Sequence, residues 1–120
     1  MISGTDHMNG DVRDSVIRAA MADLINAVTT LRQSGQIEMS QSLKGLAEHV
    51  MSAPIPAQVR HEIIENLIFV GQQAQMPRER RKRGVLKAVL GFVKHTTQTV
   101  PSLEDTWHTY GHSVENFFSL

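Results

Sequence analysis

The sequence predicts an all-α protein, a single-domain helical bundle of about five helices. Apolar residues recur three and four positions apart and never alternate strictly, which indicates helices rather than strands. The chain has 120 residues, of which 41% are hydrophobic, so it can bury one core but is too short for two ordinary domains. It contains no cysteine, which excludes disulfide frameworks and thiolate zinc sites.

We expect the bundle to occupy residues 11–120. Residues 1–10 are polar, contain glycine and show no periodicity, which predicts a disordered lead-in. His7 and Met8 form the dipeptide that a common cloning site adds to a protein, so part of this segment could derive from a cloning vector.

The first predicted helix runs from about Asp11 to about Ser34. Asp11 can cap its start, and Gly35 is a suitable left-handed stop. Its apolar row is widened by three further residues, and we expect all of them to face the core. The row is Val12, Val16, Ala20, Leu24, Val28 and Leu31, and the flanking residues are Ile17, Met21 and Ile25.

Three further helices are predicted between residues 37 and 97. The second covers residues 37–51 and ends before Pro54 and Pro56. Gly45 lies inside it, at a cost of roughly 1 kcal/mol relative to alanine. The third covers residues 56–74, with a polar face that holds Arg60, His61, Glu62 and Glu65, and the fourth runs from Pro77 to about residue 97.

The fifth predicted helix begins after Pro101, where Ser102 and Asp105 have the spacing of a capping box. Its apolar residues are spaced four, three, four and three, which is typical of a narrow coiled-coil seam. Two interpretations stay open: the helix docks on its own bundle, or the seam associates with a second copy or a partner helix. The seam comprises Leu103, Trp107, Tyr110, Val114 and Phe117, with Phe118 beside it.

The formal net charge of zero hides an uneven distribution. Residues 1–77 hold five basic and eight acidic residues, and residues 95–120 hold three acidic residues and no lysine or arginine. Between them lies a block with one acidic residue and seven basic ones. The basic residues are Arg78, Arg80, Arg81, Lys82, Arg83, Lys87 and Lys94.

On a helix over residues 77–97, one side is basic and the other apolar. Arg80, Arg83, Lys87 and Lys94 share that basic side, opposite Val85, Val89 and Val93. It could bind an acidic protein, an anionic membrane surface or nucleic-acid phosphate, or it could simply be solvated. Nucleic acid is the least supported partner, because no aromatic residue is interleaved with the cations.

A weak metal-ligating pattern also occurs in the fifth helix. Glu104, His108 and His112 share one stripe with Glu115, and two imidazoles four residues apart can hold zinc or nickel. A solvated polar face explains the same pattern, so we assign no metal. The chain shows no phosphate-binding loop, nucleophile motif or paired carboxylates. The sequence therefore predicts a non-enzymatic protein without a cofactor or small-molecule substrate.

Residues 46–120 resemble a group of small, mostly uncharacterised bacterial all-helical proteins. The matching pieces are Leu46-Ala47-Glu48, the break at Pro54 and Pro56, Glu62-Ile63-Ile64-Glu65-Asn66-Leu67, Gly84-Val85-Leu86-Lys87-Ala88-Val89-Leu90, and a tail with Trp107, Tyr110, Gly111, Val114, Phe117, Phe118 and Leu120. Ser119 departs from the glycine usual in that tail. Members of the group occur alone or beside effector and signalling domains of predicted defence (conflict) systems. The resemblance implies a bacterial accessory or adaptor module and supplies no catalytic residue.

We therefore expect a cytoplasmic protein-interaction or adaptor module that forms homo-oligomers. The first twenty residues lack the apolar stretch of a secretory signal, and the longest apolar run is far shorter than the roughly 20 residues of a membrane span. The expected contact surfaces are the fifth-helix seam or the first helix, with the basic face of the fourth helix as a recognition site. The alternatives are peripheral binding to an anionic membrane and nucleic-acid binding, both through that basic face.

Overall fold

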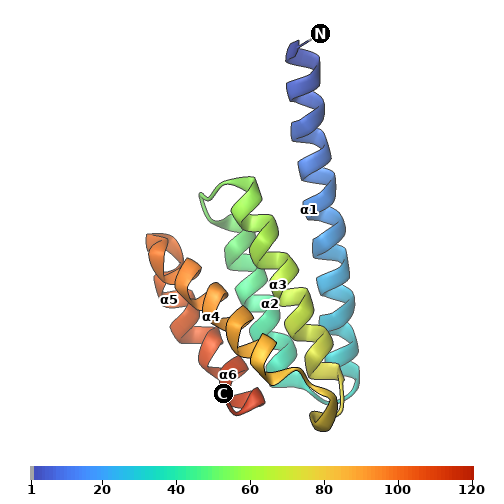
Figure 1. Ribbon diagram of the computed structural model, residues 1–120, viewed down its shortest axis with the longest axis vertical. Coiled ribbons are helices and arrows are strands. Elements are labelled where there is room, and N and C mark those ends of the chain that lie inside the picture. The colour runs from blue at the N-terminus through green and yellow to red at the C-terminus, as the bar shows by residue number, and fades with distance from the viewer. Residues whose placement is uncertain (1) are drawn as a thin grey trace.

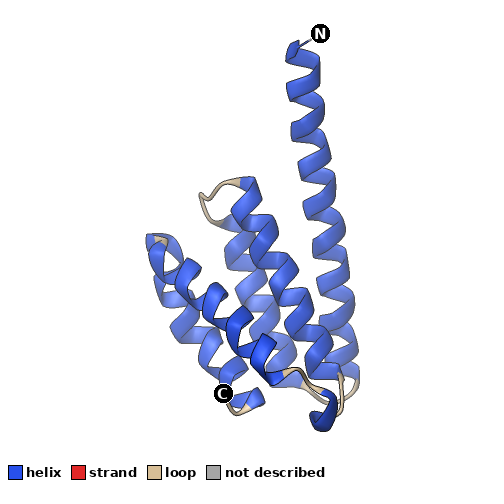
Figure 2. Cartoon of the chain, in the orientation of Figure 1, coloured by secondary structure: helices blue, strands red, loops and turns tan. Residues whose placement is uncertain are grey.

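The computed structural model describes the backbone of residues 2–120 and the side chains of residues 14–120, and it confirms the all-α fold. The described chain contains no strand (Figure 2). Its elements are α1 (Ile2–Gln33), α2 (Ile37–Ser52), α3 (Ala57–Gln75), the 3-10 turn η1 (Arg78–Arg80), α4 (Arg83–Thr99), the 3-10 turn η2 (Pro101–Leu103), α5 (Glu104–Thr106), the π-helical turn η3 (Trp107–Gly111) and α6 (His112–Phe118).

The helices form three layers (Figure 1). α2 and α3 lie in the middle, α1 packs on one side of them, and α4 packs on the other side with the segment α5–η3–α6. The fully buried side chains of all layers join in one core, which includes Leu24, Leu43, Ile63, Leu86 and Trp107. None of the described helices is long and apolar enough to cross a membrane.

α1 runs from Ile2 to Gln33. The side chains of residues 1–13 lie outside the described part, so the expected lead-in over residues 1–10 stays a prediction. At the other end Gly35 adopts a φ of +89°, and the N–H of Gln36 donates to the Leu31 carbonyl at 2.8 Å, which confirms the predicted left-handed stop.

The predicted fourth helix is wrong at its start. Residues 78–80 form the separate turn η1, Arg81 is extended with a ψ of 137°, and α4 begins only at Arg83. The extended link lets Arg81 donate to carbonyl groups at the C-terminal end of α3. The helix macrodipole favours a cation at that end of a helix.

The last helical segment contains a π-turn that the sequence analysis did not predict. Leu103 occupies the cap position and no side chain caps α5, so the predicted capping box of Ser102 and Asp105 does not form. The π-turn follows at once, and its close packing depends on glycine. A Cβ at Gly111 would overlap the Trp107 ring, which is fully buried.

Gly45 is required for a similar reason. The Tyr110 ring lies against its backbone, in the space that a Cβ would fill. His49, one turn later in α2, stacks on the same ring at a centroid distance of 5.6 Å. The glycine that weakens α2 locally therefore lets the C-terminal helical segment approach it closely.

Candidate functional site

The basic block is partly used inside the fold. The Nε of Arg81 donates to the carbonyls of Gln73 and Met76, both at 3.1 Å, and its Nη2 donates to the Ala74 carbonyl at 3.3 Å. These carbonyls lie at the C-terminal end of α3, where the last carbonyl groups lack the usual i+4 donor; that of Gln73 also accepts the Met76 backbone N–H at 3.1 Å. Burial of the guanidinium, and then the nearby charge of Arg78, lowers the pKa of Arg81, while Glu79 raises it.

Two aromatic rings hold Arg81 from the other side. Its guanidinium carbon lies 4.9 Å from the centre of the Phe117 ring and 5.3 Å from that of Phe118, both in α6. The same corner is reinforced by Gln73, whose buried Oε1 accepts the Lys82 backbone N–H at 2.8 Å. Arg81 thus joins α3 to α6, and its role is structural.

Of the four cations predicted on one side of the fourth helix, Arg83, Lys87 and Lys94 lie on α4, whereas Arg80 does not. Arg83 donates from Nη2 to the Ser119 carbonyl at 3.1 Å. Lys94 is half-buried, whereas Lys82 and Lys87 are exposed. Arg78 and Arg80 are also exposed, but they lie on η1, so the helical stripe that should have included Arg80 is wrong.

The exposed surface of α4 also carries apolar side chains. Leu86, Leu90 and Val93 face the core, but Val85 is 48% exposed and Phe92 is 39% exposed. The sequence analysis assigned Val85 to the apolar stripe of this helix. The structure shows that the buried arc is narrower than that stripe.

The predicted interface seam belongs to the chain's own core. Leu103, Trp107, Val114 and Phe118 are buried, and Tyr110 and Phe117 are half-buried against the same cluster. The seam packs on α2 and α4, so it is not available to a second copy or a partner helix. The coiled-coil spacing therefore reports intramolecular packing.

The candidate metal ligands do not gather. Glu104, His108 and His112 are exposed, and the His108 and His112 ring centres lie 5.8 Å apart. The π-turn changes the spacing of the stripe between them. Within residues 14–120, no group of three histidine, aspartate or glutamate side chains is placed to hold a metal ion.

Arg60, predicted on a solvated polar face, instead closes the turn between α2 and α3. Its Nη2 donates to the carbonyls of Ala53 at 2.8 Å and Ile55 at 3.3 Å, and its Nε donates to the Val50 carbonyl at 3.3 Å. Arg60 and Arg81 therefore have similar roles. Arg60 donates to carbonyl groups at the C-terminal end of α2 and in the turn after it, and Arg81 donates to those at the C-terminal end of α3.

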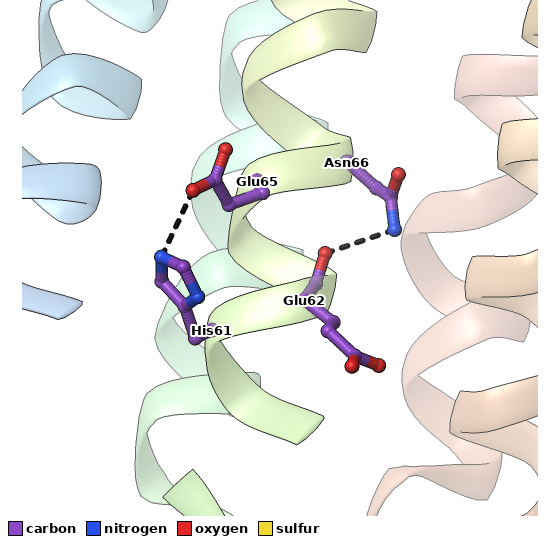
Figure 3. A network of polar contacts seen from close by, with 4 residues as sticks. All are labelled: His61, Glu62, Glu65 and Asn66. Carbon is purple, nitrogen blue, oxygen red and sulfur yellow. Dashed lines mark hydrogen bonds and ion pairs between the residues drawn. The ribbon is translucent and has the colours of Figure 1, made fainter. Parts of the chain in front are cut away.

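The rest of the α3 polar face makes local contacts (Figure 3). His61 Nε2 lies 2.9 Å from Glu65 Oε1, and Asn66 Nδ2 donates to the Glu62 carbonyl at 2.9 Å. His61 and Glu65 also line a small hollow of about 210 Å³ with Asp23 of α1. Because this ion pair joins neighbouring turns of one helix, it supports α3 without forming a recognisable site.

The strongest candidate site is a groove between α1 and α2. Its volume is about 520 Å³, and its residues come from about three turns of α1, between Met21 and Gln33, and from one edge of α2. Buried Leu24 and Ala47 form its floor. Along its α1 wall, Ile25 is 52% exposed, and Met21 and Val28 are half-buried. The lining residues are Met21, Leu24, Ile25, Val28, Thr29, Arg32, Gln33, Lys44 and Ala47.

The rim of this groove carries two cations. Arg32 of α1 and Lys44 of α2 both line it and are exposed. The sequence analysis named the first helix as an expected contact surface, but not the residues of this groove, because it assigned Met21, Ile25 and Val28 to the core. A signal for this site in the sequence is the width of the apolar arc on the first helix, which is wider than the neighbouring helices can cover.

Comparisons with protein-family models, curated proteins and solved structures found no match. The resemblance to bacterial all-helical proteins therefore stays a prediction, and the proposals below rest on the geometry of this chain.

Proposed function

We propose that the chain is a non-enzymatic protein-interaction module that binds an amphipathic helix in the α1–α2 groove. The observation that carries this proposal is the apolar wall of Met21, Ile25 and Val28, which leaves Ile25 half-exposed beside a basic rim. An apolar stripe with spacings of four and three, next to a neighbouring helix, is the surface that helix-in-groove recognition uses.

The chemistry of the rim specifies the partner further. Arg32 lies at the end of α1 and lines the groove, so an acidic side chain at one end of the bound helix would face it. The partner is therefore an amphipathic helix whose apolar stripe covers about two turns and whose acidic residue lies beyond one end of that stripe.

Cysteine labelling in cells tests this proposal, because the chain contains no native cysteine. A Thr29→Cys variant places a thiol on the exposed rim of the groove, and Thr30→Cys places one on the same helix outside the groove. We expect Thr29→Cys to react more slowly with a maleimide in cells of the source organism than as dilute purified protein. Thr30→Cys should react at similar rates in both. Equal ratios at the two positions would contradict the proposal.

A second candidate function is peripheral binding to an anionic membrane, and the exposed apolar residues of α4 favour it. Val85 and Phe92 are exposed on a helix that also carries exposed Lys87 and follows the cations of η1. Flotation with anionic and neutral vesicles tests it, with Phe92→Ser compared with the wild type. Binding to neither vesicle, or equal binding by the variant, would count against this function.

A further inference from the structure

We propose that the groove is occupied by α1 of a second copy of this chain, packed antiparallel about a two-fold axis. This inference rests on the proposed function of the groove and names its occupant. Each copy would lay the exposed face of its α1 into the α1–α2 groove of the other. The result is a four-helix arrangement in which both copies use the same surface.

The first argument is the pattern of α1. The residues on its groove side are spaced four, three, four, three and four, which keeps them on one stripe along a helix that packs at a shallow angle. The stripe is Asp14, Arg18, Met21, Ile25, Val28 and Arg32. Polar residues flank its apolar middle, so the stripe has the composition of a helix–helix contact with charged ends.

The second argument is charge complementarity. Asp14 and Arg32 lie five helical turns apart, about 27 Å, and therefore point to the same side of α1. In an antiparallel pair, Asp14 of each copy lies opposite Arg32 of the other, at the rim of the groove. A parallel pair would instead place Arg32 against Arg32 and Asp14 against Asp14, which is repulsive.

The same register matches the rest of the stripe. With Asp14 opposite Arg32, Met21 lies opposite Ile25, so the apolar residues meet at the two-fold axis. Arg18 lies opposite Val28, where its aliphatic stem can cover the valine while its charge stays in solvent. One register thus satisfies the charges and covers Ile25, which is 52% exposed in the single chain.

No described side chain forms an ion pair with Asp14 or Arg32 at the ends of the stripe. Among the described side chains, the ion pairs are His61–Glu65 and His112–Glu115, and neither involves α1. Asp14 and Arg32 are both exposed. Association would therefore not require either residue to break an ion pair with another described side chain.

Exchange of the two charges tests the register directly. Asp14→Arg and Arg32→Asp each turn both symmetry-related contacts into like-charge pairs, so each variant alone should dimerise about 10- to 100-fold more weakly than the wild type. A mixture of the two variants restores both contacts and should form the heterodimer. The double variant Asp14→Arg/Arg32→Asp should again form a homodimer. Sedimentation equilibrium from nanomolar to high micromolar concentration measures all four.

Asp23→Arg is the matched control, because Asp23 is exposed on the opposite flank of α1 and should leave dimerisation unchanged. Recovery in the mixture also excludes misfolding as the cause of weak association by the single variants. A monomeric wild type, a mixture that stays monomeric, or an equal effect of Asp23→Arg would overturn the inference. If the wild type is monomeric but Thr29→Cys is still protected in cells, the occupant is another protein and the proposed function survives.

Discussion

Replacing Arg81 with alanine should destabilise the protein more than any other change in the basic block. The side chain makes three hydrogen bonds to carbonyls at the end of α3 and lies over the rings of Phe117 and Phe118. Its loss therefore weakens the end of α3 and the contact between α3 and α6 together. The alanine variant tests whether this arginine is structural, as the geometry indicates, or part of a solvated basic face.

The expected magnitude follows from these contacts. Arg81 uses two donor groups, each worth about 1.5 kcal/mol at the low end for a charged hydrogen bond, and the ring contacts add about 0.5–1 kcal/mol. Release of the side chain returns about 1–1.5 kcal/mol of conformational entropy. We therefore expect the free energy of unfolding to fall by about 2–3 kcal/mol, which corresponds to a Tm about 8–12 °C lower for a domain of this size.

Urea unfolding followed by circular dichroism measures this change, and two variants serve as controls. Arg80→Ala removes an exposed neighbour and should change the free energy of unfolding by less than about 0.5 kcal/mol. Arg81→Lys keeps the charge but loses the planar fork, so it should recover about half of the loss. Arg81→Ala and Arg80→Ala with equal stability would refute the structural role of Arg81.

Three other predictions have defined outcomes. Gly45→Ala should destabilise the protein by about 1–2 kcal/mol, because the added Cβ meets the Tyr110 ring. Gly91→Ala should stabilise it by about 0.5–1 kcal/mol, because nothing lies within 4 Å of the added Cβ. Thermal unfolding of the two variants measures both effects, and a stabilised Gly45→Ala would contradict the close contact. Arg60→Ala should cost about 1–3 kcal/mol in urea unfolding, since three carbonyls lose a donor; an unchanged midpoint would show that water replaces it. Trp107 is fully buried, so its fluorescence should be blue-shifted in the native state and shift to the red on unfolding; a native spectrum like that of the unfolded chain would place the ring in solvent.

The sequence predicts the features of this fold that depend on local patterns. Gly35 ends α1 in a left-handed conformation, and Pro54 and Pro56 lie in the turn between α2 and α3. Glycine tolerates a positive φ and proline fixes φ, whatever the surrounding tertiary structure. The helical periodicity likewise identifies α2 and α3 to within a few residues. Such information is carried by neighbouring residues and needs no knowledge of the tertiary structure.

The candidate site depends on tertiary contacts, which periodicity does not report. The spacing of the Trp107 seam is equally suited to a core and to an interface, and only the positions of α2 and α4 decide between them. Ile25 shows the opposite case, because its place on the apolar arc indicates burial while no described helix covers it. Arg81 is hidden from sequence reasoning because its partners are backbone carbonyls, whose positions no residue type reveals.

α1 forms one outer layer of the bundle and packs chiefly on α2 and α3. Opening of α1 exposes Leu24 and Leu31, which are buried in the shared core, so it has a defined free-energy cost. Whatever binds α1 adds RT ln(1 + [L]/Kd) to the cost of that opening. The ratio of the amide exchange rates in α1 and α4 therefore measures the fraction of the protein that is bound at a given concentration.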